Sequence, residues 1–258
     1  MSWERYSGIS RFAAQYFLFP RLDFGQRSAF QDYMTPLHPD FGVSLPTLPA
    51  PAVLDAALRE HALVVVRAAN LTDASLLALG HALGHVDSGV KRFTGEGPSP
   101  DQNWHHVGVI VDAPARATLL YPEIATPGAP GMQFVSMRAA WRALPAAEQQ
   151  ALAGRVAVHT FRSAPSQRAA QPLVFSPQDA AETALFVGYH AVGIEGMPNT
   201  EAQPLLAGLM SRATALPRIH THAFQPGDFI VWDNRALMHR ACALPAGTSR
   251  AVREIAVG

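Results

Sequence analysis

The segment from Pro226 to Cys242 constrains the fold most, because two strands and two sharp turns follow one another within it. Pro226-Gly-Asp predicts a turn, and Phe229–Trp232 is an uninterrupted apolar run of branched and aromatic residues that is typical of a buried strand. Asp233-Asn-Arg predicts a second turn, and Leu237–Cys242 a second short strand. A chain that reverses direction so often favours sheets over long helices.

Other segments have the same short-strand character. Further strands are predicted at Ala62–Arg67, Trp104–Val111 and Thr118–Tyr121. Helices are predicted at Ala52–His61, at Asp73–Leu83 with Thr72 as its N-cap and Gly84 at its end, and at Met137–Leu144, whereas the Gly- and Pro-rich segment Lys91–Asp101 predicts a loop. Many short strands with few helices indicate a mostly β fold, a sandwich or jelly roll with flanking helices.

Length and composition set the class of protein. The chain has 258 residues, of which 48% are hydrophobic and 16% charged, so it can bury a large core within one domain. Twenty basic residues balance twenty acidic ones, which argues against nucleic acid or a membrane surface as a partner. A single cysteine excludes an internal disulfide, and no apolar run approaches the ~20 residues of a membrane span. We predict a cytoplasmic protein and leave a homo-oligomer open.

The domain organisation is predicted to be simple. Residues 1–33, rich in aromatic residues and arginine, are expected to form an N-terminal extension. Residues 34–258 are expected to form the single functional domain.

The eleven histidines are the first candidates for chemistry, although most are expected to serve packing or the surface. That applies to the isolated residues His38, His61, His81, His85, His159 and His190. His220 and His222 share one face of a strand because they lie two residues apart, but without a third partner we rank a metal site there below a structural role.

His105 and His239 differ because of the motifs around them. Trp104-His-His-Val-Gly108, Phe134–Pro145 and above all Pro226–His239, with arginines at 250 and 253, resemble the taurine dioxygenase family of Fe(II)- and 2-oxoglutarate-dependent oxygenases. The resemblance spans about Met34 to Gly258. It implies a double-stranded β-helix, or jelly roll, for residues 34–258.

The resemblance also implies a metal site. The family binds iron on a histidine, a carboxylate two residues later and a distant histidine, and the first and last of these match His105 and His239. The carboxylate position is Val107, so the expected acid is missing. Met132 stands where a family threonine helps to hold 2-oxoglutarate, and a thioether offers no O–H donor.

Two arginines are implied to bind anions. Arg250, eleven residues after His239, matches the arginine that grips the far carboxylate of 2-oxoglutarate, and Arg253 matches more loosely an arginine that meets acidic substrates in some relatives. A buried arginine without an anionic partner is costly, so Arg250 favours a bound anion. Asp228 or Asp233 could be that partner instead.

Four interpretations of the missing carboxylate stay open. Water or another group could complete a two-histidine iron site, or a halide could bind there, although Val107 would crowd it. His106 or Asp112 could be recruited as a ligand, which a regular strand would not allow without a bulge or bend. Finally, the chain could be a binding protein or partner subunit that kept the fold and lost the chemistry.

The resemblance implies a mononuclear non-haem iron enzyme. It would use Fe(II), 2-oxoglutarate and O₂ to hydroxylate or otherwise oxidise a small molecule, with an atypical two-histidine metal site. The alternatives are a halogenase-like variant and a non-catalytic binding or partner protein on the same fold.

Overall fold

The computed structural model describes residues 33–258 except 68, 87, 98, 101, 112–113, 162–163 and 177–181. The predicted extension over residues 1–33 lies, apart from Tyr33, outside the described residues. Residues 35–258 form one compact unit, which is mostly β with flanking helices, as the sequence predicts.

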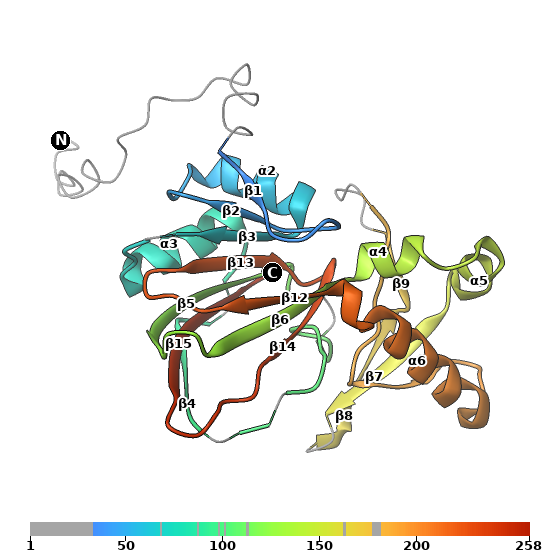
Figure 1. The fold of residues 1–258 in the computed structure, drawn as a ribbon. Coiled ribbons are helices and arrows are strands. Elements are labelled where there is room, and N and C mark those ends of the chain that lie inside the picture. Colours follow the sequence, from blue (N-terminus) through green and yellow to red (C-terminus); the bar gives the residue numbers. More distant parts are fainter. Residues whose placement is uncertain are drawn as a thin grey trace, which may run out of the picture. The chain divides into compact units, whose positions relative to one another are not determined.

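Two facing sheets, whose strands are mostly antiparallel, make up the main body of this unit (Figure 1). The larger sheet has the strand order β1 (Thr35–Pro36), β2 (Val43–Leu45), β3 (Leu63–Val66), β13 (Phe229–Asp233), β5 (Ala117–Ala125), β15 (Ser249–Val257) and β4 (Lys91–Glu96). The smaller sheet has the order β12 (Ile219–Ala223), β6 (Pro130–Ser136) and β14 (Leu237–Ala241).

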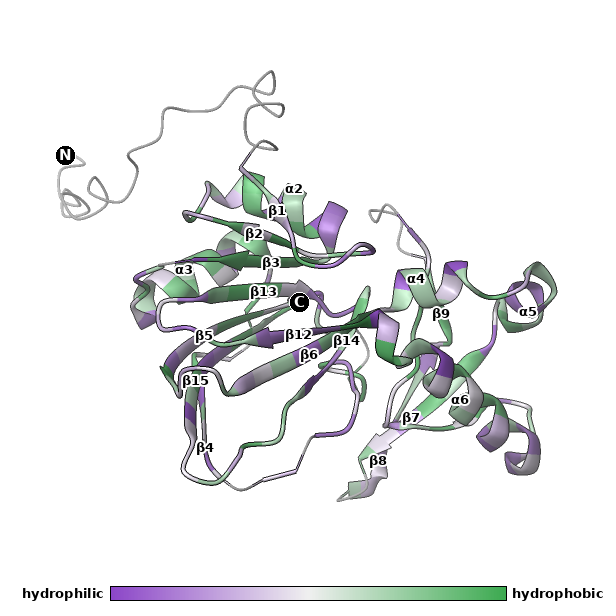
Figure 2. Ribbon diagram, in the orientation of Figure 1, coloured by the Kyte–Doolittle hydropathy of each residue, from purple (hydrophilic) through white to green (hydrophobic). Residues whose placement is uncertain are grey.

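The central strands are apolar because both of their faces are covered. Every residue of β3 and β13 is buried, and both strands are green in Figure 2. Val231 of β13 lies opposite Val64 of β3 on one side and Leu119 of β5 on the other. Large side chains of these strands and of their neighbours form one hydrophobic core, which includes Leu63, Leu120, Phe134, Phe224, Ile230, Trp232 and Val252.

Two helices support the larger sheet. They are α2 (Pro51–His61) and α3 (Asp73–Leu83). Thr72 caps α3 as predicted. Its side chain accepts a hydrogen bond from the Ser75 amide, and the Ser75 side chain accepts one from the Thr72 amide. Gly80 of α3 allows close packing, since a Cβ there would come within 3.3 Å of the Ile255 side chain on β15.

The remaining elements form a second core. A three-stranded sheet of β11 (Ala191–Ile194), β7 (Val156–Phe161) and β8 (Ala164–Pro172) lies with the pair β9 (Val174–Phe175) and β10 (Ala184–Leu185). The helices α4 (Met137–Arg142), α5 (Ala146–Leu152) and α6 (Asn199–Ala213) contribute to the same core, and the 3₁₀ turn η2 (Leu216–Arg218) follows α6. Trp104 is buried in this core, which fixes the segment that leads into His105.

Two sequence predictions of local structure are wrong. The segment Lys91–Glu96 forms strand β4 on the edge of the larger sheet, although its mostly exposed side chains give no apolar alternation. The segment Trp104–Val111 is not a regular strand, because only His105 makes a bridge and a turn follows it, with Gly108 at a φ of 74°. Both outcomes depend on pairing with distant strands.

None of the helices in the described part of the chain is long and apolar enough to span a bilayer.

Candidate active site

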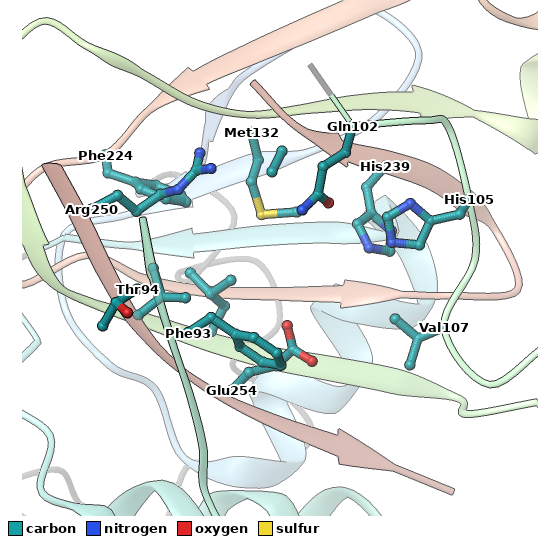
Figure 3. A pocket seen from close by; sticks show the side chains of 13 residues that line it. Phe93, Thr94, Gln102, His105, Val107, Met132, Phe224, His239, Arg250 and Glu254 are labelled. Atoms are coloured by element: carbon teal, nitrogen blue, oxygen red, sulfur yellow. The ribbon is translucent and has the colours of Figure 1, made fainter. Parts of the chain in front are cut away.

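A cavity of about 310 Å³ opens among β4, β5, β6, β14 and β15 (Figure 3). Its polar lining consists of Thr94, Gln102, His105, His239, Arg250 and Glu254. Its apolar lining consists of Phe93, Val107, Leu120, Met132, Phe224, Ala241 and Val252. Of the four residues to which the sequence assigned a metal or anion, His105, His239 and Arg250 line this cavity, as do Val107 and Met132.

The two histidines are brought together by the backbone. The amide of His105 donates to the His239 carbonyl at 3.0 Å, and the amide of His239 donates to the His105 carbonyl at 3.1 Å. This antiparallel bridge places both side chains on one face, with ring centroids 4.5 Å apart. The Tyr189 amide also donates to the Trp104 carbonyl at 2.9 Å, so the segment before His105 is fixed from both sides.

The surroundings keep both imidazoles neutral. Burial lowers the pKa of His105, and burial together with the neighbouring His105 lowers the pKa of His239 well below its ordinary value. The His105 Nδ1 lies 2.7 Å from the Asn103 carbonyl, which can only accept, so Nδ1 carries the proton and Nε2 holds the lone pair. The Nδ1 of His239 is buried without a hydrogen-bond partner among the described residues.

Val107 lines the same cavity two residues after His105. The structure brings no group of three His, Cys, Asp or Glu side chains into an arrangement that could hold a metal ion, within the described residues. Asp112, one of the alternative ligands, lies outside them. His105 and His239 thus bring imidazole nitrogens to the cavity, and Val107 beside them is apolar.

His106 faces away from the cavity, as expected for the neighbour of His105. It is 2% exposed and stacks on Phe186, with ring centroids 4.3 Å apart. Its Nδ1 lies 2.6 Å from the Asn234 carbonyl, and burial lowers its pKa to about 3. A neutral ring in this position donates one hydrogen bond to the backbone, so His106 stabilises the fold beside the cavity rather than lining it.

Strand β15 divides its side chains between two faces. Arg250, Val252 and Glu254 alternate onto the cavity side, as the period of two requires. Arg253 lies on the opposite side, where its guanidinium bonds Asp73 at 2.8 Å and the Leu71 carbonyl at 2.7 Å. The structure does not bring Arg253 to the cavity. Its guanidinium is already paired with two acids, Asp73 and, at 3.0 Å, Glu123.

Arg250 makes no ion pair with another described residue. Its Nη1 donates to the Gly131 carbonyl at 2.9 Å and to the Cys242 carbonyl at 3.3 Å, and burial lowers its pKa. Both acids that the sequence offered as partners are used elsewhere. Asp228 binds Arg67 at 2.8 Å and His222 at 2.9 Å, and Asp233 binds Arg235 at 3.2 Å. A partly buried guanidinium therefore faces the cavity without forming an ion pair with a described carboxylate.

The cavity residues that were not singled out from the sequence include Phe93, Gln102 and Glu254. A signal existed for Glu254, because it lies an even number of residues after Arg250 on one strand and must share its face. No signal existed for Phe93, which reaches the cavity only because the unpredicted strand β4 pairs with β15, with Phe93 opposite Val252.

The pair His220 and His222 shares one face of β12, as the spacing predicts, with ring centroids 6.2 Å apart. The Nε2 of His222 forms a hydrogen bond with the Asp228 carboxylate, and both oxygens of Asp228 accept hydrogen bonds from Arg67. This arrangement is a structural network of hydrogen bonds.

The comparison with protein families decides the identity of the domain. The model of the taurine catabolism dioxygenase TauD/TfdA family matches residues 32–256. The chain belongs to this family. The TauD/TfdA domain thus covers the jelly roll, both histidines and Arg250.

Curated relatives of this TauD/TfdA chain are similar over little more than half of their length. An α-ketoglutarate-dependent 2,4-dichlorophenoxyacetate dioxygenase of Cupriavidus pinatubonensis is 31% identical over 59% of this chain and 58% of its own. An (S)-phenoxypropionate/α-ketoglutarate dioxygenase of Delftia acidovorans is 30% identical over 54% of each chain.

Solved structures confirm the jelly roll of the TauD/TfdA chain. A taurine dioxygenase from Burkholderia xenovorans superposes with a TM-score of 0.77 at 23% identity, covering 87% of this chain and 89% of its own. The structure of AAD-2 in complex with Mn(II) and N-oxalylglycine superposes with a TM-score of 0.78 at 21% identity, covering 87% and 95%.

Proposed function

We propose that this chain is an Fe(II)- and 2-oxoglutarate-dependent oxygenase that oxidises a small molecule. His105 and His239 would hold the metal, Arg250 would anchor 2-oxoglutarate, and Val107 would stand where relatives carry the carboxylate ligand. The chain spans about half the length of its curated relatives, so the activity rests on the family domain and on this cavity.

One observation carries the proposal: two neutral histidines line the same cavity as a guanidinium that forms no ion pair with a described carboxylate. The histidine rings lie side by side, and the lone pair of His105 is on Nε2. A neutral imidazole is a common ligand of iron, and arginine is suited to a carboxylate.

The residues present fit iron and 2-oxoglutarate in donor type. His239 keeps a buried Nδ1 that has no hydrogen-bond partner among the described residues, and two imidazole nitrogens match the metal's preference. The apolar Val107 supplies no third donor, so 2-oxoglutarate and water would complete the shell. When bound, the iron centre with 2-oxoglutarate and O₂ supplies the oxidising power for attack on a C–H bond.

The chain's own residues bind, orient and exclude water. The Asn103 carbonyl fixes the His105 tautomer, and the antiparallel bridge fixes the spacing of the two rings. The guanidinium of Arg250, which donates to two backbone carbonyls, would reorient to bind the distal carboxylate of 2-oxoglutarate. The apolar wall of Leu120 and Val252 would keep the reacting part of the substrate dry.

An anaerobic titration of the metal-free protein with Fe(II) and 2-oxoglutarate tests this proposal. A chelated iron–2-oxoglutarate complex gives a visible metal-to-ligand charge-transfer band, which we expect in the wild type. His105→Ala should abolish the band because an iron ligand is lost, and Arg250→Ala should raise the 2-oxoglutarate concentration needed for it by at least about tenfold.

Two exposed residues provide matched controls: His81→Ala on α3 and Arg168→Ala on β8 should leave the band unchanged. Absence of the band, together with absence of iron from protein purified from cells, would contradict the proposal.

A specific observation favours a second candidate, a non-catalytic binding protein on the same fold. The described residues hold no ready-made group of three metal-binding side chains. This candidate predicts that Arg250 still binds a dicarboxylate without iron, which calorimetry with 2-oxoglutarate alone would detect. A halogenase-like variant is distinguished by chloride dependence of the product.

A further inference from the structure

Glu254 places a carboxylate on the wall of the cavity. It lies on β15 two residues beyond Val252 and opposite Leu120 of β5, and both of these neighbours also line the cavity. Figure 3 shows its carboxylate directed into the space that the His105 and His239 rings face. The acid therefore belongs to the same cavity as the proposed metal ligands.

Within the described residues, no hydrogen bond or ion pair joins Glu254 to another side chain. Lys91, its register partner on the edge strand β4, is exposed and does not line the cavity. Burial raises the pKa of Glu254, and the charge of Lys91 only partly opposes this. A partly buried carboxylate without a partner is a position where a cationic ligand group would be stabilised.

The charges on the cavity wall are few and opposite. Apart from the two histidines that the proposed function assigns to iron, Arg250 and Glu254 are the two ionisable side chains among the described lining residues. If Arg250 holds 2-oxoglutarate, the group left to meet the substrate is an anion. Arg253 cannot compensate, because it is bound to acids on the other side of the sheet.

We propose that Glu254 recognises a protonated amine, so that this enzyme acts on a small ammonium compound with an apolar body. This inference rests on the proposed function, because it assigns Arg250 to 2-oxoglutarate. It separates this chain from the relatives named for phenoxyacetate and phenoxypropionate, which are carboxylates. An anionic substrate would meet Glu254 with no free cation among the described lining residues.

The rest of the wall suits such a ligand. Phe93 lies diagonally across the ladder from Glu254, on the same face, and could place its ring against an ammonium group. Leu120, Val252 and Phe224 supply apolar contact for the carbon skeleton. A cavity of about 310 Å³ that also takes 2-oxoglutarate restricts the substrate to a small molecule.

Three probes of matched size test the charge preference: benzylamine, benzyl alcohol and benzoate. Their dissociation constants are measured by calorimetry near neutral pH on the full chain, with and without 2-oxoglutarate. We expect benzylamine to bind at least roughly tenfold more tightly than benzyl alcohol, because a hydrogen bond between charged groups is stronger than one between a carboxylate and a neutral hydroxyl. With 2-oxoglutarate present, benzoate should bind more weakly than either.

Variants of Glu254 connect the preference to this residue. Glu254→Gln keeps the shape and removes the charge, so it should abolish the advantage of benzylamine over benzyl alcohol. Glu254→Lys should instead favour benzoate. Lys91→Met, the matched control on the register partner, should change the benzylamine affinity less than about twofold, as for an exposed charge.

Benzylamine that binds no more tightly than benzyl alcohol, or equally well to Glu254→Gln, would overturn the inference. This comparison needs no iron, so its failure is distinct from that of the proposed function. A charge-transfer band without amine preference would leave the oxygenase standing and the amine substrate rejected. Amine binding without the band would reject the oxygenase and leave Glu254 as a binding residue for an amine ligand.

Discussion

Under the proposed function, Val107 stands at the position where a third protein ligand to the iron is missing. It lines the cavity two residues after His105, where its apolar side chain offers no electron pair. Under the proposed function, Val107→Asp should lower the dissociation constant for Fe(II) by at least about tenfold, because an added carboxylate brings a third ligand and a negative charge to a dication. Anaerobic competition with a chelator measures this.

Val107→Asn is the matched control, because it has the shape of aspartate without its charge. It should improve iron binding much less than Val107→Asp. Equal dissociation constants for the wild type and the aspartate variant would indicate that the side chain at this position does not reach the metal.

Strand β15 and helix α3 act together at the scale of elements. One face of β15 carries Arg250 and Glu254 into the cavity, and the other packs on α3, where Arg253 bonds Asp73 at the first turn. Arg253→Leu should therefore lower the free energy of unfolding by about 1–3 kcal/mol, since Asp73 and the Leu71 carbonyl lose the guanidinium that binds them. Urea denaturation measures the loss.

The same variant should keep its 2-oxoglutarate affinity within about twofold, because Arg253 faces away from the cavity and sites without shared partners act independently. A stable Arg253→Leu protein that no longer binds 2-oxoglutarate would show that this arginine acts on the cosubstrate after all.

The N-terminus of α3 offers a smaller, local test. Thr72→Ala removes the side-chain acceptor of the Ser75 amide and should cost about 1 kcal/mol of unfolding free energy. Thr72→Ser keeps the hydroxyl and should recover most of that loss. If both variants denature at the same urea concentration, the cap does not stabilise the helix.

At the scale of the whole molecule, buried histidines tie stability to pH. His159 is fully buried, and burial lowers its pKa to about 4. The unfolded chain, with an ordinary pKa near 6.5, binds this proton first as pH falls, so the stabilisation is complete above about pH 6.5 and is lost toward pH 4. His159 alone should cost about 2 kcal/mol between about pH 7.5 and pH 5.

Urea denaturation of the metal-free protein at these two pH values measures the loss. His159→Phe removes the titrating group, keeps a ring of similar size and should show a smaller difference between them. An unchanged difference would mean that His159 is protonated in the folded protein or contributes nothing. Light scattering, which gives the mass in solution, would decide the separate question of whether the chain forms a homo-oligomer.

Local chemistry made much of the molecule predictable. The turn and strand from Pro226 to Asp233, the cap at Thr72 and the helix Asp73–Leu83 follow from short-range preferences, and the structure has each of them. The neighbourhood of His105, His239 and Arg250 was likewise expected from the motifs around these residues. Their assigned roles stay predictions.

Tertiary pairing decided the rest. The strand Lys91–Glu96 exists because the edge of β15 offers unpaired backbone groups, which no pattern within that segment reveals. Arg253 and Glu254 are adjacent in sequence but enter opposite environments, because alternate side chains of a strand leave the sheet in opposite directions and only the assembled sheet determines which direction is the cavity. The sequence by itself determined which reactive groups this protein has, and the packing of distant strands decided which of them meet, since contact depends on separation in space rather than along the chain.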